Sequence, residues 1–242
     1  MKCLIIAAGK GSRLQLRGNS KPLIPVFGVP LIERVIRSAM AADVDEFFVV
    51  TGYQNENVTS FLKNLSVRLK IPIRAIFNED WQQENGVSVL KARDYIQEPF
   101  LLLMSDHIFD PNTLRELMEV PLPHGEINLA VDRAIDNSSV NLDDVTRVKI
   151  EKGKVLEIGK GLANYNGFDT GIFLCTPSIF KALEQSTEQH DNTTLSGGVC
   201  ILASQGRVNA AEFSGKFWID VDDPEALRQA ENILLNYLPD SF

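Results

Sequence analysis

Two glycines and a set of cations follow the first apolar run of the chain. Residues 3–6 lead into Ala7-Ala8-Gly9-Lys10-Gly11-Ser12-Arg13, and Lys21-Pro22 comes eight residues after this loop. Glycine lets backbone amides approach a ligand and converge on phosphate oxygens, while neighbouring cations neutralise the phosphate charge. The residue types therefore predict a strand that ends in a binding loop for a polyphosphate.

Two other phosphate-binding motifs do not fit this loop. A Walker A loop has four residues between its first glycine and a Gly-Lys-Ser/Thr ending, whereas Gly11 follows Gly9 too soon and no such triplet occurs later. The dinucleotide fingerprint needs a third glycine where this chain has Leu14, and an acidic residue where it has Thr51-Gly52. The loop thus argues against a P-loop ATPase and against a dehydrogenase.

Three aspartates far apart in the sequence have the chemistry of a metal site. Asp106 closely follows the apolar run 101–104, and ligands of open α/β sheets bind beyond the carboxyl ends of the strands. Asp220 and Asp222 fall on one face of an extended segment, because side chains alternate along a strand. Carboxylates together with phosphate oxygens and water suit Mg2+. These aspartates could complete a hard-cation site beside the glycine loop.

Ordinary structural roles compete with this interpretation. Asp106 could cap a helix expected from residue 111, although Asp110 is better placed to do so, and Asp223 before Pro224 has the position of an N-cap. Taken alone, the cluster at 218–224 would more often be a helix start than a ligand site. No zinc-like histidine spacing, Gly-x-Ser-x-Gly elbow or Cys/His pair offers a nucleophile, so covalent catalysis has no candidate.

The composition limits the classes of partner. The 242-residue chain carries 24 Lys and Arg against 32 Asp and Glu, a net charge of -8, and has no long basic tract for nucleic acid. Its three cysteines lie in apolar runs, no apolar run approaches the ~18 residues of a membrane span, and the N-terminus does not resemble a signal peptide. We expect a cytoplasmic protein with neither a nucleic-acid partner nor stable membrane insertion.

Buried strand patterns alternate with helix patterns up to residue 131. Runs that are apolar on both faces are typical of parallel strands covered by helices, and they occur at 3–7, 46–50, 71–77, 100–104 and 127–131. Helix patterns lie between them at 30–42, 55–65, 87–95 and 111–120. This order predicts a three-layer, doubly wound, Rossmann-like α/β fold.

The regular alternation of strand and helix patterns ends at residue 131. Shorter strand patterns at 145–150, 154–158 and 169–175, with a hairpin turn at 151–153, predict an inserted β-ribbon over a mixed, mostly parallel sheet. Helix patterns return at 177–185, 193–203 and 224–237, with one more strand near 207–213. Without a linker or an internal repeat, residues 1–242 are expected to form a single domain.

These features together resemble the nucleotidyltransferase family that makes NDP-sugars and CDP-alcohols. The loop from Ala7 to Arg13 with Lys21-Pro22 is similar to the signature of that family, and Asp106 and residues 218–222 fall where its magnesium ligands do. The resemblance spans essentially the whole chain. It implies the nucleotidyltransferase fold, in which 1–131 mainly bind the nucleotide and 132–242 mainly bind the acceptor and complete the metal site.

Within this family the chain is most similar to the cytidylyltransferases that use inositol 1-phosphate. The motifs that carry the similarity are Asn85-Gly86-x-Ser88, Met104-x-Asp106-His107, Ile158-Gly159-Lys160, Asp169-Thr170-Gly171 and Trp218-x-Asp220-Val221-Asp222. Ser105 stands where the family more commonly has glycine. The implied reaction is Mg2+-dependent transfer of CMP from CTP to inositol 1-phosphate, which yields CDP-inositol, a phospholipid precursor, and pyrophosphate. A homodimer is left open.

Other interpretations stay open at this point. The acceptor could instead be a sugar 1-phosphate, phosphocholine or aminoethylphosphonate, and a non-catalytic regulatory domain could share the fold. Phosphocholine would need an aromatic box, for which the ribbon offers only Tyr165 and Phe168. A regulatory domain could have lost Arg13, Lys21 or Asp106, and all three are present.

The resemblance also implies a role for each site residue. The second pKa of a phosphate monoester is about 6, so the attacking phosphate oxygen needs no general base. The expected catalytic residues are Arg13 on the β- and γ-phosphates, Lys21 on the α-phosphate, and Asp106, which holds Mg2+ with Asp220 and Asp222. Nucleotide contacts are expected from Ala7, Ala8, Gly9, Lys10, Gly11, Ser12, Glu79, Asn85, Gly86 and Ser88, and acceptor contacts from Asp132, Lys149, Lys160, Asp169 and Thr170. Arg133 and Arg147 are further cations beside the ribbon.

Overall fold

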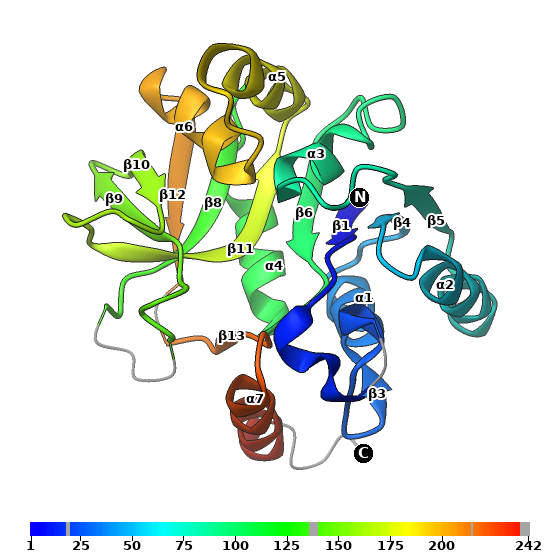
Figure 1. The fold of residues 1–242 in the computed structure, drawn as a ribbon. Coiled ribbons are helices and arrows are strands. Elements are labelled where there is room, and N and C mark those ends of the chain that lie inside the picture. Colours follow the sequence, from blue (N-terminus) through cyan, green and yellow to red (C-terminus); the bar gives the residue numbers. More distant parts are fainter. Residues whose placement is uncertain (18–19, 136–139, 214, 238–242) are drawn as a thin grey trace.

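A mixed sheet of nine strands forms the centre of the protein, in the order β5-β4-β1-β6-β11-β8-β12-β10-β9 (Figure 1). The computed structural model describes residues 1–17, 20–135, 140–213 and 215–237. The strands of this sheet are β1 (Lys2–Ala7), β4 (Glu46–Thr51), β5 (Ile73–Phe77), β6 (Phe100–Met104), β8 (Ile127–Asp132), β9 (Arg147–Glu151), β10 (Lys154–Gly159), β11 (Gly167–Cys175) and β12 (Val208–Glu212). The pairings leave only β10 and β11 antiparallel to the other strands of this sheet.

Helices cover both faces of the sheet, which makes the three layers predicted from the sequence. They are α1 (Leu31–Ala41), α2 (Asn55–Leu69), α3 (Asn85–Leu90), α4 (Pro111–Glu119), α5 (Ser178–His190), α6 (Leu195–Ser204) and α7 (Pro224–Tyr237). Leu4 and Ile6 of β1 pack in one core with α3, α5 and α6, while Cys3 and Ile5 pack in a second core with α1, α2 and α4. This alternation explains why β1 is apolar on both faces.

The second half of the chain differs from the prediction in one respect. The segment 169–175 was expected in a ribbon over the sheet, but β11 lies inside the sheet, antiparallel to both β6 and β8. Its apolar side chains are buried on both faces, as a central strand requires. The ribbon itself is the hairpin β9–β10, which extends the edge of the sheet and turns at Lys152 and Gly153, both with positive φ.

Most helix boundaries agree with the predicted ones to within a few residues. Asp110 caps α4 by accepting a hydrogen bond from the amide of Asn112 at 2.9 Å, and Asp223 caps α7 through the amide of Ala226 at 2.8 Å. The helix expected at 87–95 is shorter, because α3 ends at Leu90 and turns follow. In the described part of the chain, no helix is long and apolar enough to cross a membrane.

Two short strands that the sequence did not predict join segments that are far apart in the sequence. β7 (His107–Phe109) pairs antiparallel with β13 (Trp218–Asp220), with His107 opposite Asp220. The helix α7 then packs on β13 and on β2 (Pro25–Val26), which forms a small hairpin with β3 (Val29–Pro30). This third core brings the C-terminal aspartates to the carboxyl end of β6.

Candidate active site

A cavity of about 450 Å³ opens at the carboxyl ends of β1 and β6. Its wall comes from the first loop and the Lys21-Pro22 pair, from residues 104–107, 140–146 and 218–223, from β11, and from the starts of α3, α6 and α7. Seven of its lining residues are acidic and two are lysines, so the wall of the cavity has an excess of negative charge. An anionic ligand therefore needs a cation to accompany it into this cavity.

Lys21 lies at the centre of the acidic residues. Its side chain is only 8% exposed, and its Nζ donates to Asp106 Oδ2 and Asp222 Oδ1 and lies 3.5 Å from Asp220 Oδ1. Burial disfavours the charge, but these carboxylates outweigh it and raise the pKa of Lys21. The ammonium is thus the internal counter-ion of the three carboxylates.

Glycine in the first loop makes room for this lysine. Gly11 has φ of +60°, and a Cβ at this position would lie 2.5 Å from the Cβ of Lys21. The short helix Lys21–Leu23 begins at the lysine, with Pro22 in its first turn, and fixes the direction from which the side chain enters. The predicted need for glycine therefore has two physical causes at Gly11, the backbone conformation and the close approach of Lys21.

The pairing of β7 with β13 brings Asp106 and Asp220 together. The amide of Val221 donates to the carbonyl of Asp106 at 3.0 Å, and the Val221 side chain is fully buried. Asp220 and Asp222 consequently point to the same side, toward Lys21, as the predicted alternation requires.

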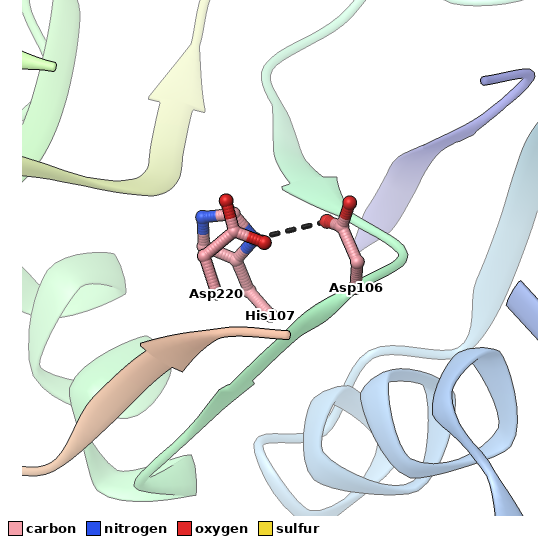
Figure 2. Close-up of side chains that lie close together, drawn as sticks. All are labelled: Asp106, His107 and Asp220. Carbon is pink, nitrogen blue, oxygen red and sulfur yellow. Dashed lines mark hydrogen bonds and ion pairs between the residues drawn. The ribbon is translucent and has the colours of Figure 1, made fainter. Parts of the chain in front are cut away.

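Asp106, His107 and Asp220 form a group that can hold a divalent cation (Figure 2). One ligand atom from each residue lies within 4.8 Å of the others. Asp220 Oδ1 is buried and has no hydrogen-bond partner among the described residues. Burial and the charge of Asp106 raise the pKa of Asp220 to about 7, so this carboxyl lacks a sufficient positive partner. The residues therefore fit a bound divalent cation.

His107 is an unexpected member of this group. Its Nδ1 lies 3.0 Å from Asp106 Oδ1 and 3.8 Å from Asp220 Oδ1. Burial lowers its pKa, but Asp220 and Asp106 outweigh burial and raise the pKa to about 9. The sequence motif Met104-x-Asp106-His107 includes this residue, but no role was expected for it. Its position directly after the aspartate at the end of the strand is the feature of the sequence that indicates a place in the site.

A bulge in β11 directs Asp169 into the same cavity. The pairing of β11 with β8 shifts between Asp169 and Phe173, and Gly171 has φ of +73°. A Cβ on Gly171 would lie 2.7 Å from the His107 ring, so glycine is required there. Asp169 Oδ1 accepts the amide of Gly171 at 2.8 Å, and burial raises the pKa of Asp169 to about 6.

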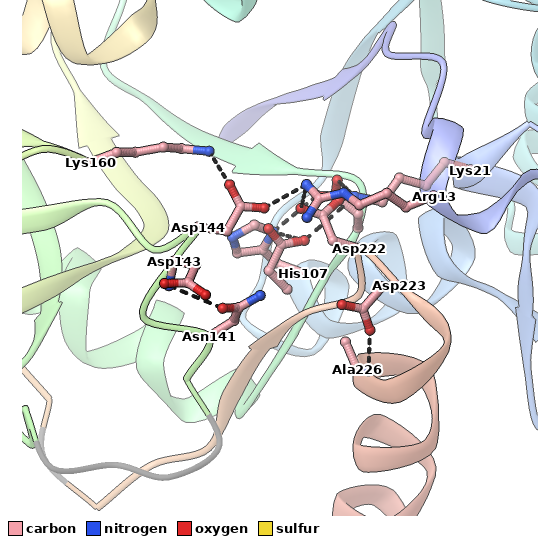
Figure 3. A network of polar contacts seen from close by, with 12 residues as sticks. Arg13, Lys21, His107, Asn141, Asp143, Asp144, Lys160, Asp222, Asp223 and Ala226 are labelled. Carbon is pink, nitrogen blue, oxygen red and sulfur yellow. Dashed lines mark hydrogen bonds and ion pairs between the residues drawn. The ribbon is translucent and has the colours of Figure 1, made fainter.

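Asp144 links two of the predicted cations across the cavity (Figure 3). Arg13 Nη2 donates to Asp144 Oδ2 at 2.5 Å and to Asp222 Oδ2 at 3.1 Å, and Lys160 Nζ donates to Asp144 Oδ1. The Lys160 and Arg13 cations lower the pKa of Asp144 to about 2. No motif in the sequence pointed to Asp144, which lies in an irregular acidic segment before β9.

The structure brings about half of the predicted site residues to the cavity wall. These residues are Ala7, Gly9, Lys21, Asn85, Asp106, Lys160, Asp169, Asp220 and Asp222. Arg13 contacts two of the lining aspartates. The positions Ala8, Lys10, Gly11, Ser12 and Gly86 lie within three residues of a lining residue but do not line the cavity themselves.

Five other predicted contacts are engaged elsewhere. Glu79 is exposed and pairs with Lys91 at 2.8 Å, and Lys149 pairs with Glu157 at 2.9 Å. Thr170 is buried and donates to the carbonyl of Ala130. Ser88 Oγ accepts from Asn78, and Asp132 accepts from the indole of Trp218 at 2.9 Å. None of the five lines the cavity. Glu79 and Lys149 pair with other charged side chains, and the other three make hydrogen bonds within the fold.

Comparison with protein families and curated proteins identifies related sequences. The model of the MobA-like NTP transferase domain matches residues 3–155. A bifunctional IPC transferase and DIPP synthase of Rubrobacter xylanophilus is 37% identical over 96% of this chain, and one of Aquifex aeolicus is 34% identical over 96%. The match covers 52% and 51% of these relatives, so the chain spans about half their length.

Solved structures with the same fold have lower sequence identity. The inositol-1-phosphate CTP transferase from T. maritima superimposes with a TM-score of 0.85 at 22% identity, over 99% of this chain and 96% of that one. A UDP-glucose pyrophosphorylase complexed with UDP-glucose gives 0.80 at 20% identity, over 97% and 98%. The Rossmann-like nucleotidyltransferase fold expected from the sequence is thereby confirmed.

Replacing Lys21 by methionine should destabilise the protein in the absence of metal and increase its response to metal. The substitution leaves three carboxylates without their ammonium, which should cost about 2 to 4 kcal/mol of unfolding free energy, since breaking a buried ion pair is expensive. Added Mg2+ should raise the melting temperature of the variant more than that of the wild type. Equal melting temperatures in EDTA would show that Lys21 is not the counter-ion.

Asp169→Asn should stabilise the protein at high pH. The pKa of about 6 lies above the ~4 of an unfolded aspartate, so the folded state loses stability as the pH rises through this window. Asparagine keeps an oxygen for the Gly171 amide and carries no charge. Urea unfolding should show the variant more stable by about 1 to 3 kcal/mol at pH 8, with a smaller difference at pH 5. A difference that does not change with pH would contradict the raised pKa.

Proposed function

The chain belongs to the family of MobA-like NTP transferase domains, and on this basis we propose that it is a Mg2+-dependent cytidylyltransferase. The proposed reaction transfers CMP from CTP to inositol 1-phosphate and gives CDP-inositol and pyrophosphate. The observation that carries the reaction class is the cluster of Lys21, Asp106 and Asp220 at the sheet edge beside the first loop. The names of the IPC transferases and of the inositol-1-phosphate CTP transferase support the substrates.

The site suits a reaction between two anions. The acceptor's phosphate is already mostly dianionic at neutral pH, so its oxygen attacks the α-phosphorus without a base. The enzyme must align the two anions and offset their repulsion, which is a matter of position and charge. The cavity supplies these functions through Lys21, Lys160 and the neighbouring Arg13, and no additional nucleophile is needed.

Asp106 and Asp220 would hold the metal, with Asp222 and His107 close by. Bound Mg2+ would supply positive charge to nucleotide oxygens and to the leaving pyrophosphate. Carboxylate oxygens are its preferred protein ligands, which favours Mg2+ at Asp106 and Asp220. With the carboxylates neutralised by the metal, Lys21 would donate to the α-phosphate, and Arg13 would donate to the β- and γ-phosphates.

The remaining contacts follow from the cavity wall. Gly9 and its neighbours in the first loop offer backbone amides to the nucleotide, and Asn85 lies across from them with its Oδ1 on the amide of Leu195. Lys160 and Asp169 are the acceptor contacts that reach the cavity. We do not assign direct contacts to Glu79, Ser88, Asp132, Lys149 and Thr170. A cytoplasmic location and a homodimer stay predictions.

A sugar 1-phosphate is the second candidate acceptor. It is favoured by the structural likeness to UDP-glucose pyrophosphorylase. Phosphocholine is disfavoured, because Arg147 covers the ring of Tyr165 at 4.9 Å and Phe168 is fully buried. These two rings therefore do not form an open aromatic box.

Pyrophosphate release with each NTP and a panel of phosphorylated alcohols tests the proposal. CTP with inositol 1-phosphate should be the preferred pair and should require Mg2+. Asp106→Asn should lower turnover about a hundredfold or more, because it removes charge from the metal group. Asp94→Asn, at a side chain that is 84% exposed, is the matched control and should leave turnover unchanged.

Two outcomes would count against the proposal. If no pair releases pyrophosphate, the protein is not a nucleotidyltransferase acting on these substrates. If UTP or dTTP with a hexose 1-phosphate is preferred, the reaction class stands and the substrate assignment is wrong.

A further inference from the structure

One edge of the central sheet is open. β5 is the outermost strand, and within the described part of the chain it pairs with β4 alone, while α2 packs beside it (Figure 1). At the opposite end of the sheet, β9 pairs with β11 as well as with β10. An exposed edge strand presents backbone donors and acceptors that can pair with another chain. The β5 edge is therefore the side on which this sheet can be extended.

Alternate residues of β5 direct their backbone groups to the open side. The carbonyl of Pro72 accepts from β4 at 3.0 Å, and the amide of Asn78 donates to β4 at 2.8 Å. Backbone groups of successive residues in a strand point to opposite sides, so the even positions from 72 to 78 bond to β4. The residues whose N–H and C=O groups face the open side are then Ile73, Ala75 and Phe77.

The open edge is apolar. Phe77 is 51% exposed, and Ile73 and Ala75, on the same face of the strand, are only partly buried against the core under α2. Sheet edges are commonly protected by charged side chains that prevent pairing with another chain. Arg74 is the one charged residue of β5, and it lies over the ring of Tyr95 at 5.4 Å, on the other face of the strand. The edge thus combines an exposed aromatic ring with backbone groups that are available for pairing.

We propose that two copies of this chain pair through β5 and form a dimer with one continuous sheet. An antiparallel pair with its two-fold axis at Ala75 sets Ile73 opposite the partner's Phe77 and Ala75 opposite the partner's Ala75. This register forms about six backbone hydrogen bonds, because each opposed pair of outward-facing residues exchanges two. It also lays the exposed Phe77 ring on the partner's Ile73, since side chains at opposed positions share a face of the sheet.

The charges at the two ends of the edge favour the same register. It sets Lys70 opposite the partner's Asp80. Lys70 is exposed and makes no ion pair with the residues that the structure describes. Asp80 is 44% exposed and shares the ammonium of Lys91 with Glu79, so this end has an excess of negative charge. The basic end of each edge therefore meets the acidic end of the other, and the two-fold axis repeats the contact.

Sedimentation equilibrium over a range of protein concentrations tests the dimer. The wild type should dimerise reversibly with a Kd on the order of 10 μM, because a pair of short strands buries less area than a standard interface. Ala75→Pro should weaken dimerisation about tenfold or more, since it removes an amide that faces the open side and leaves the bonds to β4 intact. Phe77→Glu should act in the same direction by placing a charge on the partner's apolar side chain.

Val67→Glu is the matched control for Phe77→Glu. It adds the same charge on α2, at a side chain that is 79% exposed and lies on the opposite side of the helix from the buried Leu62 and Leu65. This variant should dimerise like the wild type. Melting temperatures of all variants at low concentration should match that of the monomeric wild type, and Phe77→Glu decides the question if Ala75→Pro does not fold.

A charge swap tests the register. Lys70→Glu and Asp80→Lys should each weaken self-association about threefold or more, because each sets like charges opposite one another at both ends. An equimolar mixture of the two variants should dimerise like the wild type, since the mixed dimer again has opposite charges at both ends. A mixture that associates as weakly as its components would contradict this register.

The inference is overturned if the wild type stays monomeric at every concentration. It is also overturned if Ala75→Pro and Phe77→Glu dimerise as Val67→Glu does, which would place the interface on another surface. These measurements need no turnover, so they are independent of the outcome for the proposed reaction.

Discussion

Repulsion among partly buried carboxylates is the constraint on which this site depends. Asp106, Asp220 and Asp222 converge at the edge of the sheet, and their charges can be tolerated there only if positive charge lies among them. Lys21 supplies it, yet one oxygen of Asp220 has no hydrogen-bond partner in the part of the chain that the structure describes. The excess of negative charge attracts a metal ion. A bound metal ion would in turn reduce the electrostatic repulsion between the acidic cavity and a polyphosphate. The ion pairs of Lys21 thus balance carboxylate charge that a bound metal ion would otherwise balance.

The fold makes this convergence possible by joining segments that are remote in the sequence. The parallel strands β1 and β6 deliver the first loop and Asp106 to the same edge, as in other open α/β sheets. The pairing of β7 with β13 adds the C-terminal aspartates, and β11, inserted antiparallel beside β6, adds Asp169. Gly11 and Gly171 leave the space that Lys21 and His107 need. Each of these side chains is positioned by its own strand or loop, and the hydrogen-bonded sheet fixes these strands relative to one another.

The sequence predicted the parts of this arrangement that have a strong local pattern. Buried strands, capped helices and a hairpin turn within 151–153 follow from periodicity and turn chemistry, and the structure confirms them. The alternation of Asp220 and Asp222 around Val221 also followed from strand geometry. These features can be predicted because they depend only on residues that are close to one another in the chain.

Features set by long-range pairing could not be predicted in this way. Nothing near residue 169 shows that β11 enters the sheet between β6 and β8, since a buried strand has the same pattern in a ribbon or in a sheet. Asp144 lies between Arg13 and Lys160 only because the fold brings these segments together. The pairing of Lys149 with Glu157 and of Glu79 with Lys91 likewise depends on the folded geometry rather than on a local sequence pattern.

A crystal structure with Mg2+ and a CTP analogue that cannot be cleaved at the α-phosphate would test the role of the carboxylate cluster most directly. The electrostatics predict a metal ion bound by Asp106 and Asp220, with the ammonium of Lys21 moved from the carboxylates to the nucleotide. A bound nucleotide without metal at these residues, and with Lys21 still among the three aspartates, would contradict the central claim that the lysine and the metal neutralise the same charges in turn.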